Sequence, residues 1–380
     1  MKAILRLIGS LLIGAFIGFF IMVPLLSILD GESPIAAVRQ MFSKGFMPKL
    51  AEIGWMLIAV LIAFILHIII HEGGHLVAGL LTGYRFVSFR FLNWTLISKD
   101  GHLQWRNFEM VGTGGQCLLA PPDKPVEQID TRWYNAGGVL ANLIIVAIAL
   151  VLLWAFDLPG WLSTLLVMMV VIGLLIAAMN GIPMKMGGVA NDGLNLLQLE
   201  KDLPAKKCFA NILDINARNQ AGERYEEMPD HLFEMPEPFD WKNSMHTASA
   251  LAAASKMLSM HLWEDAYQLL TQACANKADM MQLYQMEVES MMTQACIATG
   301  RDEEARQHYD EQVKKYVTQH ASTQSDKQLT TMAVALALDN DRAAAEEIYN
   351  KLKENREKYI HQGDVAMSLD IMRWLLENRQ

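Results

Sequence analysis

Residues 65–80 read ILHIIIHEGGHLVAGL, an apolar run that contains three histidines and one glutamate. On an α-helix, residues four apart share a face, so His71 and His75 can offer two imidazole nitrogens to one zinc ion. Glu72 then lies beside that ion. In this His-Glu-x-x-His arrangement the carboxylate takes a proton from water at the metal, while the ion polarises a peptide carbonyl. The stretch therefore predicts zinc ligands at His71 and His75 and a catalytic base at Glu72.

The apolar setting of this motif favours a bound cation. Each ionisable group inside a membrane-spanning helix costs roughly 2.5–3.5 kcal/mol, so a cluster of four requires local stabilisation, which a cation provides. The alternative is a polar patch that faces a water-filled cavity without a metal. His67 lies one turn before His71 on the same face, but residue 68 is isoleucine, so that pair lacks a base. We interpret His67 as a support for the site or as part of helix packing.

The composition indicates an integral membrane protein. The hydrophobic share of the 380 residues is 52%, and the apolar residues are concentrated in the first half of the chain. Four stretches are long enough to cross a bilayer, namely residues 7–29, 53–71 and onward, 135–156, and 160–184. The uncharged run of the first is too long for a signal peptide, and no small-x-small cleavage site follows it. We therefore expect a membrane anchor over 1–29 and a mainly α fold with about four spans.

The distribution of basic residues predicts the orientation of these spans. The turn 157–160 carries no Lys or Arg, whereas the loop 85–132 and the region after residue 184 carry many. Positive loops face the cytoplasm, which places the turn outside and the other two regions inside. The basic residues of the outer loop 30–52 oppose this assignment mildly. We expect a multi-pass protein, in a bacterial plasma membrane, whose C-terminal domain is cytoplasmic.

The loop after the metal motif predicts a β-hairpin. Apolar residues alternate with polar ones over 87–91, Lys99-Asp100-Gly101 supplies turn chemistry, and a second extended run follows over 103–108. The edge of this hairpin could pair with an extended substrate backbone, or the hairpin could simply lie at the lipid surface. Cys117 is interpreted as a packed residue rather than a ligand. The four cysteines show no Cys-x-x-Cys spacing, so no disulfide framework is expected.

Two polar residues beyond this loop are candidates for the site. Asn142 lies one or two turns into the third span, so its side chain should bond either to a neighbouring helix or to a substrate carbonyl. Asp192 is the nearest carboxylate after the fourth span. Zinc held by two histidines keeps room for a third protein ligand and a water, so Asp192 is a candidate ligand. The Asp192-Gly193 pair is also typical of an ordinary turn.

Over roughly residues 50–200 the sequence resembles the site-2 protease family of membrane-embedded zinc metalloproteases. Three matches in order carry the resemblance: His71-Glu72-x-x-His75, Gly138-x-x-x-Asn142, and Asn180-x-x-Pro183 followed by Asp192-Gly193. The segment between Pro183 and Asp192 is longer than is usual in the family.

The resemblance implies a role for each matched position. His71, His75 and Asp192 would bind zinc, Glu72 would act as general base, and Asn142 would hold the substrate backbone or the oxyanion. The segment after the metal helix would be the re-entrant β region that receives the substrate. The membrane-embedded metalloprotease core would then span residues 53–200.

The last part of the chain has a different composition. Residues 219–242 mix glutamates with prolines, which predicts an acidic linker. From 243 to 380 the sequence is helical, and alanines recur every 39 to 40 residues at Ala266, Ala305 and Ala345. This pattern resembles a tetratricopeptide-type array of helical hairpins, which would bind a peptide or a protein partner. The alternative is a plain helical bundle without a groove.

These features predict a zinc-dependent intramembrane endopeptidase that cleaves membrane proteins or hydrophobic peptide precursors. Its partners would be the substrate, the lipid bilayer and a protein bound by the C-terminal helices, and no nucleic acid is expected. The competing hypothesis is a non-catalytic membrane scaffold that recruits partners through those helices. Metal transport would need ligands distributed over several spans, and the sequence contains one cluster.

Overall fold

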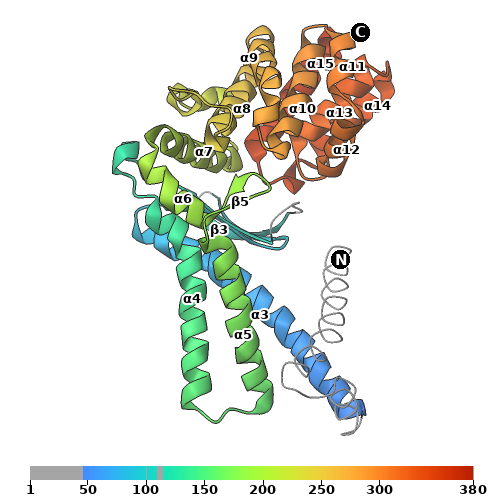
Figure 1. Ribbon diagram of the computed structural model, residues 1–380. Helices are drawn as coiled ribbons and strands as arrows, with labels where there is room; N and C mark the ends of the chain where they lie inside the picture. The colour runs from blue at the N-terminus through green and yellow to red at the C-terminus, as the bar shows by residue number, and fades with distance from the viewer. Residues whose placement is uncertain (1–45, 100, 109–113, 380) are drawn as a thin grey trace. The chain divides into compact units, whose positions relative to one another are not determined.

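The computed structural model describes residues 46–99, 101–108 and 114–379 (Figure 1). The anchor predicted over 1–29 lies outside the described residues. Three of the described helices are long and apolar enough to cross a membrane: α3 (Phe46–Leu81), α4 (Arg132–Ala155) and α5 (Gly160–Gly181). They coincide with the second, third and fourth predicted spans. The chain divides into two compact units, and each is described by itself.

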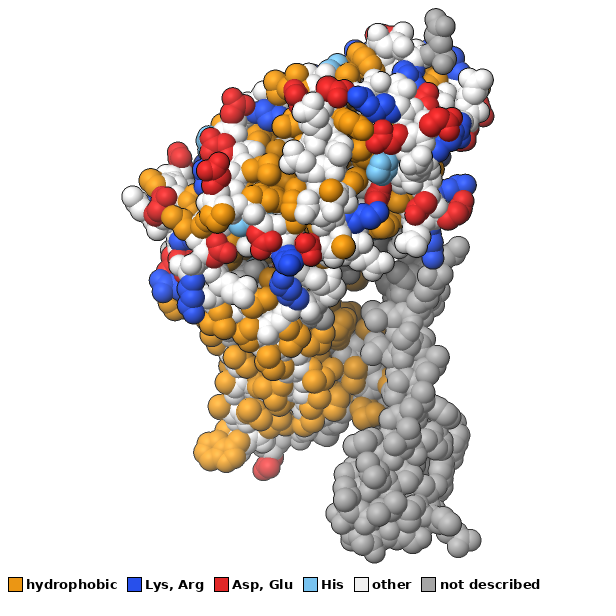
Figure 2. Space-filling view, turned by 45° about the horizontal axis from the view of Figure 1, so that its top comes forward, with side chains coloured by type: hydrophobic (Ala, Val, Ile, Leu, Met, Phe, Trp, Pro, Cys, Tyr) orange, Lys and Arg blue, Asp and Glu red, His pale blue; other side chains and the backbone are white. Residues whose placement is uncertain are grey.

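The first unit contains residues 46–70 of α3 together with residues 141–178 of α4 and α5. Ala63, Ala149 and Met169 form its buried core, and small alanine side chains allow the three helices to approach closely. Many large apolar side chains point outward instead, among them Ile144, Val151, Trp154, Val171 and Leu175. Figure 2 shows hydrophobic side chains over the surface of these helices. Such a surface is expected where lipid replaces water as the solvent.

The second unit begins with residues 71–81 of α3, which are followed by a four-stranded antiparallel sheet. The sheet comprises β1 (Arg85–Phe91), β2 (Trp94–Lys99), β3 (His102–Asn107) and β4 (Gly115–Ala120) in the spatial order β3-β2-β1-β4. The sequence predicted only a single hairpin here. The turn around residues 99–101 was predicted, but the β1–β2 turn contains Leu92 at a positive φ of 52° and no glycine. The strand β4 was not predicted, because the glycines that precede it do not indicate a strand.

A small hairpin connects α5 to the next helix. It consists of β5 (Lys185–Met186) and β6 (Val189–Ala190), and the turn between them uses Gly187 and Gly188 at φ values of 59° and 92°. Two successive positive φ values are typical of a tight hairpin turn, which glycine adopts without strain. The helix α6 (Asp192–Gln198) follows directly. This hairpin accounts for the long segment between Pro183 and Asp192.

The remainder of the second unit is helical. Its helices are α7 (Leu203–Ala221), α8 (Ser244–Ser259), α9 (Trp263–Ala275), α10 (Gln282–Ala298), α11 (Asp302–His308), α12 (Glu311–His320), α13 (Ser325–Ala337), α14 (Arg342–Glu354) and α15 (Gln362–Asn378). The recurring alanines Ala266, Ala305 and Ala345 lie fully buried near the starts of α9, α11 and α14. Each alanine of the sequence repeat thus occupies an equivalent buried position near the start of a helix.

The helices α10, α13 and α15 pack in the interior of the helical body. Every residue from Val288 to Ile297 on α10 is buried, and α15 contacts α7 and α8 as well as α13. The acidic segment 219–242 belongs to the same body, because Tyr225, Met228 and Phe233 are buried in its core. This segment therefore packs between α7 and α8 instead of linking two separate domains.

Candidate metal centre

Three side chains from two helices converge on one point in the second unit. His71 and His75 lie one turn apart on α3, and their Nε2 atoms are 3.2 Å apart. Asp192 is the first residue of α6, and its Oδ2 lies 3.1 Å from Nε2 of His71 and 3.3 Å from Nε2 of His75. The structure thus brings together the three residues that the sequence singled out as ligands.

The spacing of these three atoms fits a tetrahedral cation. Ligand atoms about 2.0–2.1 Å from a zinc ion at tetrahedral angles lie about 3.3 Å from one another. The observed separations of 3.1, 3.2 and 3.3 Å match that value, so the three atoms could occupy three corners of a tetrahedron. Oδ2 of Asp192 is buried and accepts no hydrogen bond of normal geometry from the described part of the chain. A cation would satisfy this atom.

The tautomer of His75 also suits a ligand. Its Nδ1 lies 2.7 Å from the backbone carbonyl oxygen of Tyr134, and a carbonyl can only accept, so Nδ1 carries the proton. In the neutral ring Nε2 then presents its lone pair toward Asp192 and His71, as a metal ligand must. Metal-bound histidines are usually fixed by such a bond on the other nitrogen.

Asp192 is ionised at neutral pH. Burial alone would raise the pKa of this carboxyl, but the close contacts and positive charges of His71 and His75 outweigh burial and lower the pKa to about 2. A carboxylate ligand must be deprotonated, so the local environment prepares Asp192 for a cation.

The position of Asp192 is set by its neighbour Asn191. The Asn191 side chain accepts a hydrogen bond from the backbone N–H of Leu194, which caps α6. Its amide nitrogen donates to the carbonyl oxygens of Met179, at 2.8 Å, and Ile182, at 2.6 Å. Asn191 therefore connects the start of α6 to the end of α5. Because Asp192 is the next residue, this connection fixes its position.

Glycines allow the helices to meet at this centre. A Cβ on Gly138 of α4 would lie 2.6 Å from Cε1 of His71 and 2.6 Å from Nε2 of His75. A Cβ on Gly193 would lie 2.1 Å from the carbonyl oxygen of Gly181. Both distances are shorter than van der Waals contact, so only glycine fits at either position without movement.

Glu72 lies beside the ligands and next to the sheet. The backbone N–H of Cys117 on β4 donates a hydrogen bond to the Glu72 carboxylate, and the Tyr134 hydroxyl donates to the Cys117 carbonyl at 3.1 Å. Both backbone groups of Cys117 thus point from the outer edge of β4 toward the centre. The Cys117 thiol is buried, burial raises its pKa to about 12, and it belongs to no ligand group among the described residues.

Asn142 has a different environment, in the first unit. Its Oδ1 lies 2.9 Å from Nδ1 of His67, and Nε2 of His67 donates to the carbonyl oxygen of Met169 at 2.9 Å. His67 and Asn142 are both fully buried. Asn142 therefore forms the interhelical bond that was one of its two expected roles, and His67 connects α3, α4 and α5.

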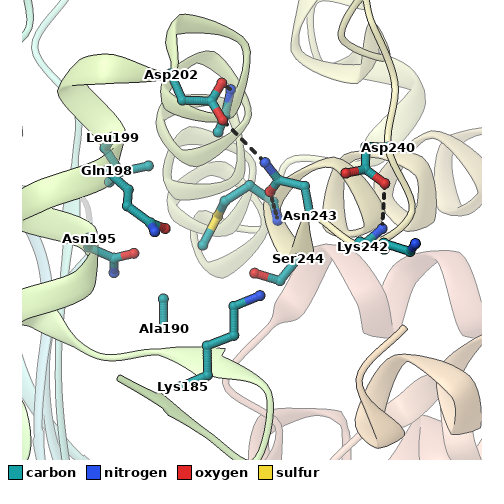
Figure 3. A pocket seen from close by; sticks show the side chains of 12 residues that line it. Lys185, Ala190, Asn195, Gln198, Leu199, Asp202, Asp240, Lys242, Asn243 and Ser244 are labelled. Atoms are coloured by element: carbon teal, nitrogen blue, oxygen red, sulfur yellow. Dashed lines mark hydrogen bonds between the residues drawn. The ribbon is translucent and has the colours of Figure 1, made fainter. Parts of the chain in front are cut away.

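A polar pocket of about 230 Å³ lies along α6 (Figure 3). Its lining includes Lys185 of β5, Asn195 and Gln198 of α6, Asn243, and Ser244 of α8. The Asn243 amide donates to Asp202 at 3.4 Å on one side of the pocket. The helix α6 thus carries a candidate ligand at its first residue and hydrogen-bonding side chains along its length.

Sequence reasoning missed three supporting groups. The Tyr134 carbonyl and the Cys117 backbone carry no side-chain pattern that a sequence displays. Asn191 had a usable signal, because Asn directly before an Asp-Gly helix start is a preferred N-cap.

A comparison of the chain with models of protein families, with curated proteins and with solved structures gave no significant match.

Proposed function

We propose that the protein is a zinc-dependent intramembrane endopeptidase. One observation carries this proposal: Nε2 of His71, Nε2 of His75 and Oδ2 of Asp192 lie within 3.1–3.3 Å of one another beside the carboxylate of Glu72. Two imidazoles and one carboxylate with an open fourth corner are the donor set of catalytic zinc sites. Structural zinc sites, in contrast, have four protein ligands.

Each residue has a chemical role in the proposal. His71, His75 and Asp192 hold the ion, which when bound lowers the pKa of water toward about 7 and polarises a peptide carbonyl. Glu72 accepts a proton from the attacking water and donates it to the leaving amine. The Tyr134 carbonyl keeps His75 in the ligating tautomer. Asn142 supports the arrangement of the helices through His67.

The proposed substrates are membrane proteins or hydrophobic peptide precursors. This choice is supported by the three helices that are long and apolar enough to cross a membrane, since the ligating histidines lie on one of them. A substrate segment must be extended before it is cut. Beside β4 it would replace the bonds that Cys117 makes to Tyr134 and Glu72 with bonds to its own backbone. Its polar part would then reach the pocket along α6.

The decisive experiment compares cells that carry the wild-type chain with cells that carry Glu72→Gln at equal expression. Fragments of membrane proteins are identified by mass spectrometry in both. An amide cannot accept the proton, so we expect particular cleavages only with the wild type, while Glu72→Gln retains its metal. Identical fragment profiles under several growth conditions would count against the endopeptidase.

The second candidate is a non-catalytic scaffold that recruits partners through the C-terminal helices. It is favoured by the size of the helical body and gives no reason for a carboxylate beside the ligands. If Glu72→Gln changes no cleavage but deletion of α8–α15 changes which proteins co-purify with the chain, the scaffold is the better description.

A further inference from the structure

The polar pocket along α6 contains side chains that neither the fold nor the proposed metal centre uses. Lys185, Asn195, Gln198 and Ser244 line this volume of about 230 Å³ from three elements, β5, α6 and α8. In Figure 3 these four side chains point toward one another across the pocket. They take part in no hydrogen bond or ion pair with the described part of the chain. One water needs only about 10–15 Å³, so the pocket has room for a larger polar group.

The charges around the pocket favour an anion on the side of α6. Both oxygens of Asp202 accept hydrogen bonds from N–H groups of the chain. Asp240 accepts a backbone N–H at 2.9 Å and lies away from α6 in Figure 3. The amine of Lys242 lies 3.8 Å from a carboxylate oxygen of Asp279. Lys185 is therefore the charged group beside α6 that has no counterion among the described residues.

The β5–β6 hairpin holds Lys185 at the pocket. Lys185 pairs with Ala190, which also lines the pocket. The turn between the two strands packs against the start of α10, because a Cβ on Gly188 would lie 2.4 Å from Cβ of Met281. The backbone of Lys185 is thus fixed from both sides, so less conformational entropy is lost when its ammonium binds an anion.

The pocket lies close to the candidate zinc ligand on the same helix. Asp192 and Asn195 are three residues apart, so they share a face of α6. At 1.5 Å per residue, Asn195 and Gln198 lie about 4.5 and 9 Å from Asp192 along the helix axis. An extended peptide advances about 3.3 Å per residue. A group in the pocket would therefore belong to roughly the second or third residue from a bond at the metal.

We propose that this pocket is a subsite for a carboxylate of the substrate, and in naming a substrate this inference rests on the proposed endopeptidase. Lys185 pairs with the carboxylate. The amide N–H groups of Asn195 and Gln198 and the hydroxyl of Ser244 donate hydrogen bonds to its oxygens. An Asp or Glu side chain and the free C-terminus of a peptide present the same two oxygens, so the test includes both sources.

Binding is measured by fluorescence anisotropy with the full-length Glu72→Gln chain in detergent, so that no peptide is cut. The probes are fluorescein-labelled peptides of alanine and leucine. Three have an amidated C-terminus and carry glutamate, glutamine or lysine near it, and the fourth has a free C-terminal carboxylate instead. We expect roughly 10–100-fold tighter binding of the glutamate peptide than of the glutamine peptide, the factor typical of a hydrogen bond to a charged group. The fourth peptide shows whether a chain end serves equally well.

Substitutions of Lys185 assign this difference to the pocket. Lys185→Met should make the glutamate and glutamine peptides bind equally, and Lys185→Glu should favour the lysine peptide. Lys185 is exposed, so both variants should fold. The matched control is Lys315→Glu, at an exposed lysine of α12, which should leave the preference for glutamate unchanged.

Two results would overturn the subsite. One is equal or undetectable binding of the glutamate and glutamine peptides, or a difference that both Lys185 variants retain. The other is a preference for the lysine peptide with Lys185 in place, which would mean that Asp202 and Asp240 decide the charge of the pocket. The two proposals fail separately. A carboxylate preference without any cleavage by the wild type would count against the endopeptidase alone, and cleavage without that preference would count against the subsite alone.

Discussion

In the proposed zinc centre, the suitability of the two histidines of α3 as ligands depends on the residues around them. His75 is held in one tautomer by the Tyr134 carbonyl, and Asp192 stays ionised because the imidazoles outweigh its burial. Without a cation, Nε2 of His75 and Oδ2 of Asp192 lie 3.3 Å apart as an ion pair when the imidazole is protonated, and a bound cation would replace that proton. The site is therefore arranged for a positive charge.

This argument makes Asp192→Asn a sharp test at the level of one residue. The amide keeps the size of the side chain but loses its charge. We expect zinc affinity at this centre to fall by more than the roughly 10–100-fold typical of changes to groups that only support a ligand. Competition with a zinc-binding dye measures this in the full-length chain. The control is Asp157→Asn, an exposed aspartate outside the centre. Equal affinity in both variants would remove Asp192 from the ligand set.

The sequence predicts those site residues whose chemistry is carried by side chains at fixed spacing. His71, Glu72 and His75 follow from the period of the helix, and Asp192 follows from the need for a third ligand. The backbone groups of Tyr134 and Cys117 could not be predicted, because their positions depend on how α4 and β4 pack. Asn142 had two expected roles, and only the structure shows its bond to His67.

Among the secondary-structure elements, the small helix α6 positions Asp192 at the centre. It has seven residues, too few to be stable alone, and its position depends on the bonds of Asn191 to the end of α5. The cap and the ligand are adjacent residues, so any loosening of the cap displaces Asp192.

Asn191→Ala should therefore weaken metal binding although Asn191 is not a ligand. We expect about 10–100-fold lower zinc affinity, together with a loss of about 1 kcal/mol in the free energy of unfolding. The matched control is Asn243→Ala, which removes the same kind of cap from α8. It should cost similar stability and leave zinc affinity unchanged. An equal effect of both variants on affinity would mean that α6 holds Asp192 by other contacts.

The packing of α4 against α3 leads to a second prediction about elements. In Gly138→Ala the new methyl group would lie 2.6 Å from atoms of both histidines, so the helices must separate or the imidazoles must turn. We expect loss of zinc at this centre and loss of cleavage. Gly54→Ala is the control, because a Cβ at Gly54 of α3 meets nothing within 4 Å. Zinc content and fragment profiles should be normal in that variant, and normal values in Gly138→Ala would contradict the observed packing.

The sequence predicted helices more accurately than strands for a physical reason. The long apolar runs leave little alternative to α3, α4 and α5, because every backbone group in such a run needs an internal partner. The strand β4 follows a glycine-rich stretch, and its pairing with β1 is non-local. The segment 219–242 is acidic, yet a few apolar side chains within it suffice to anchor it in the core.

At the scale of the whole molecule, the exposed apolar side chains predict that the chain lies in a bilayer. Moving the exposed apolar side chains of α4 and α5 from water into lipid is favourable by about 25 cal/mol per Å² of apolar surface. We therefore expect the chain to remain in the membrane after alkaline carbonate extraction. The basic loops predict that the turn between α4 and α5 is outside and the helical body is inside.

Labelling of introduced cysteines tests this orientation in intact cells. The native cysteines are suitable background, because Cys117, Cys208 and Cys296 are buried and Cys274 is partly buried. Asp157→Cys, in the exposed turn, should react with a membrane-impermeant maleimide from outside. Glu303→Cys, exposed on α11, should react only after the cells are opened. The reverse pattern would place the helical body outside, where its partners and the entry of substrate would have to be sought on the opposite side of the membrane.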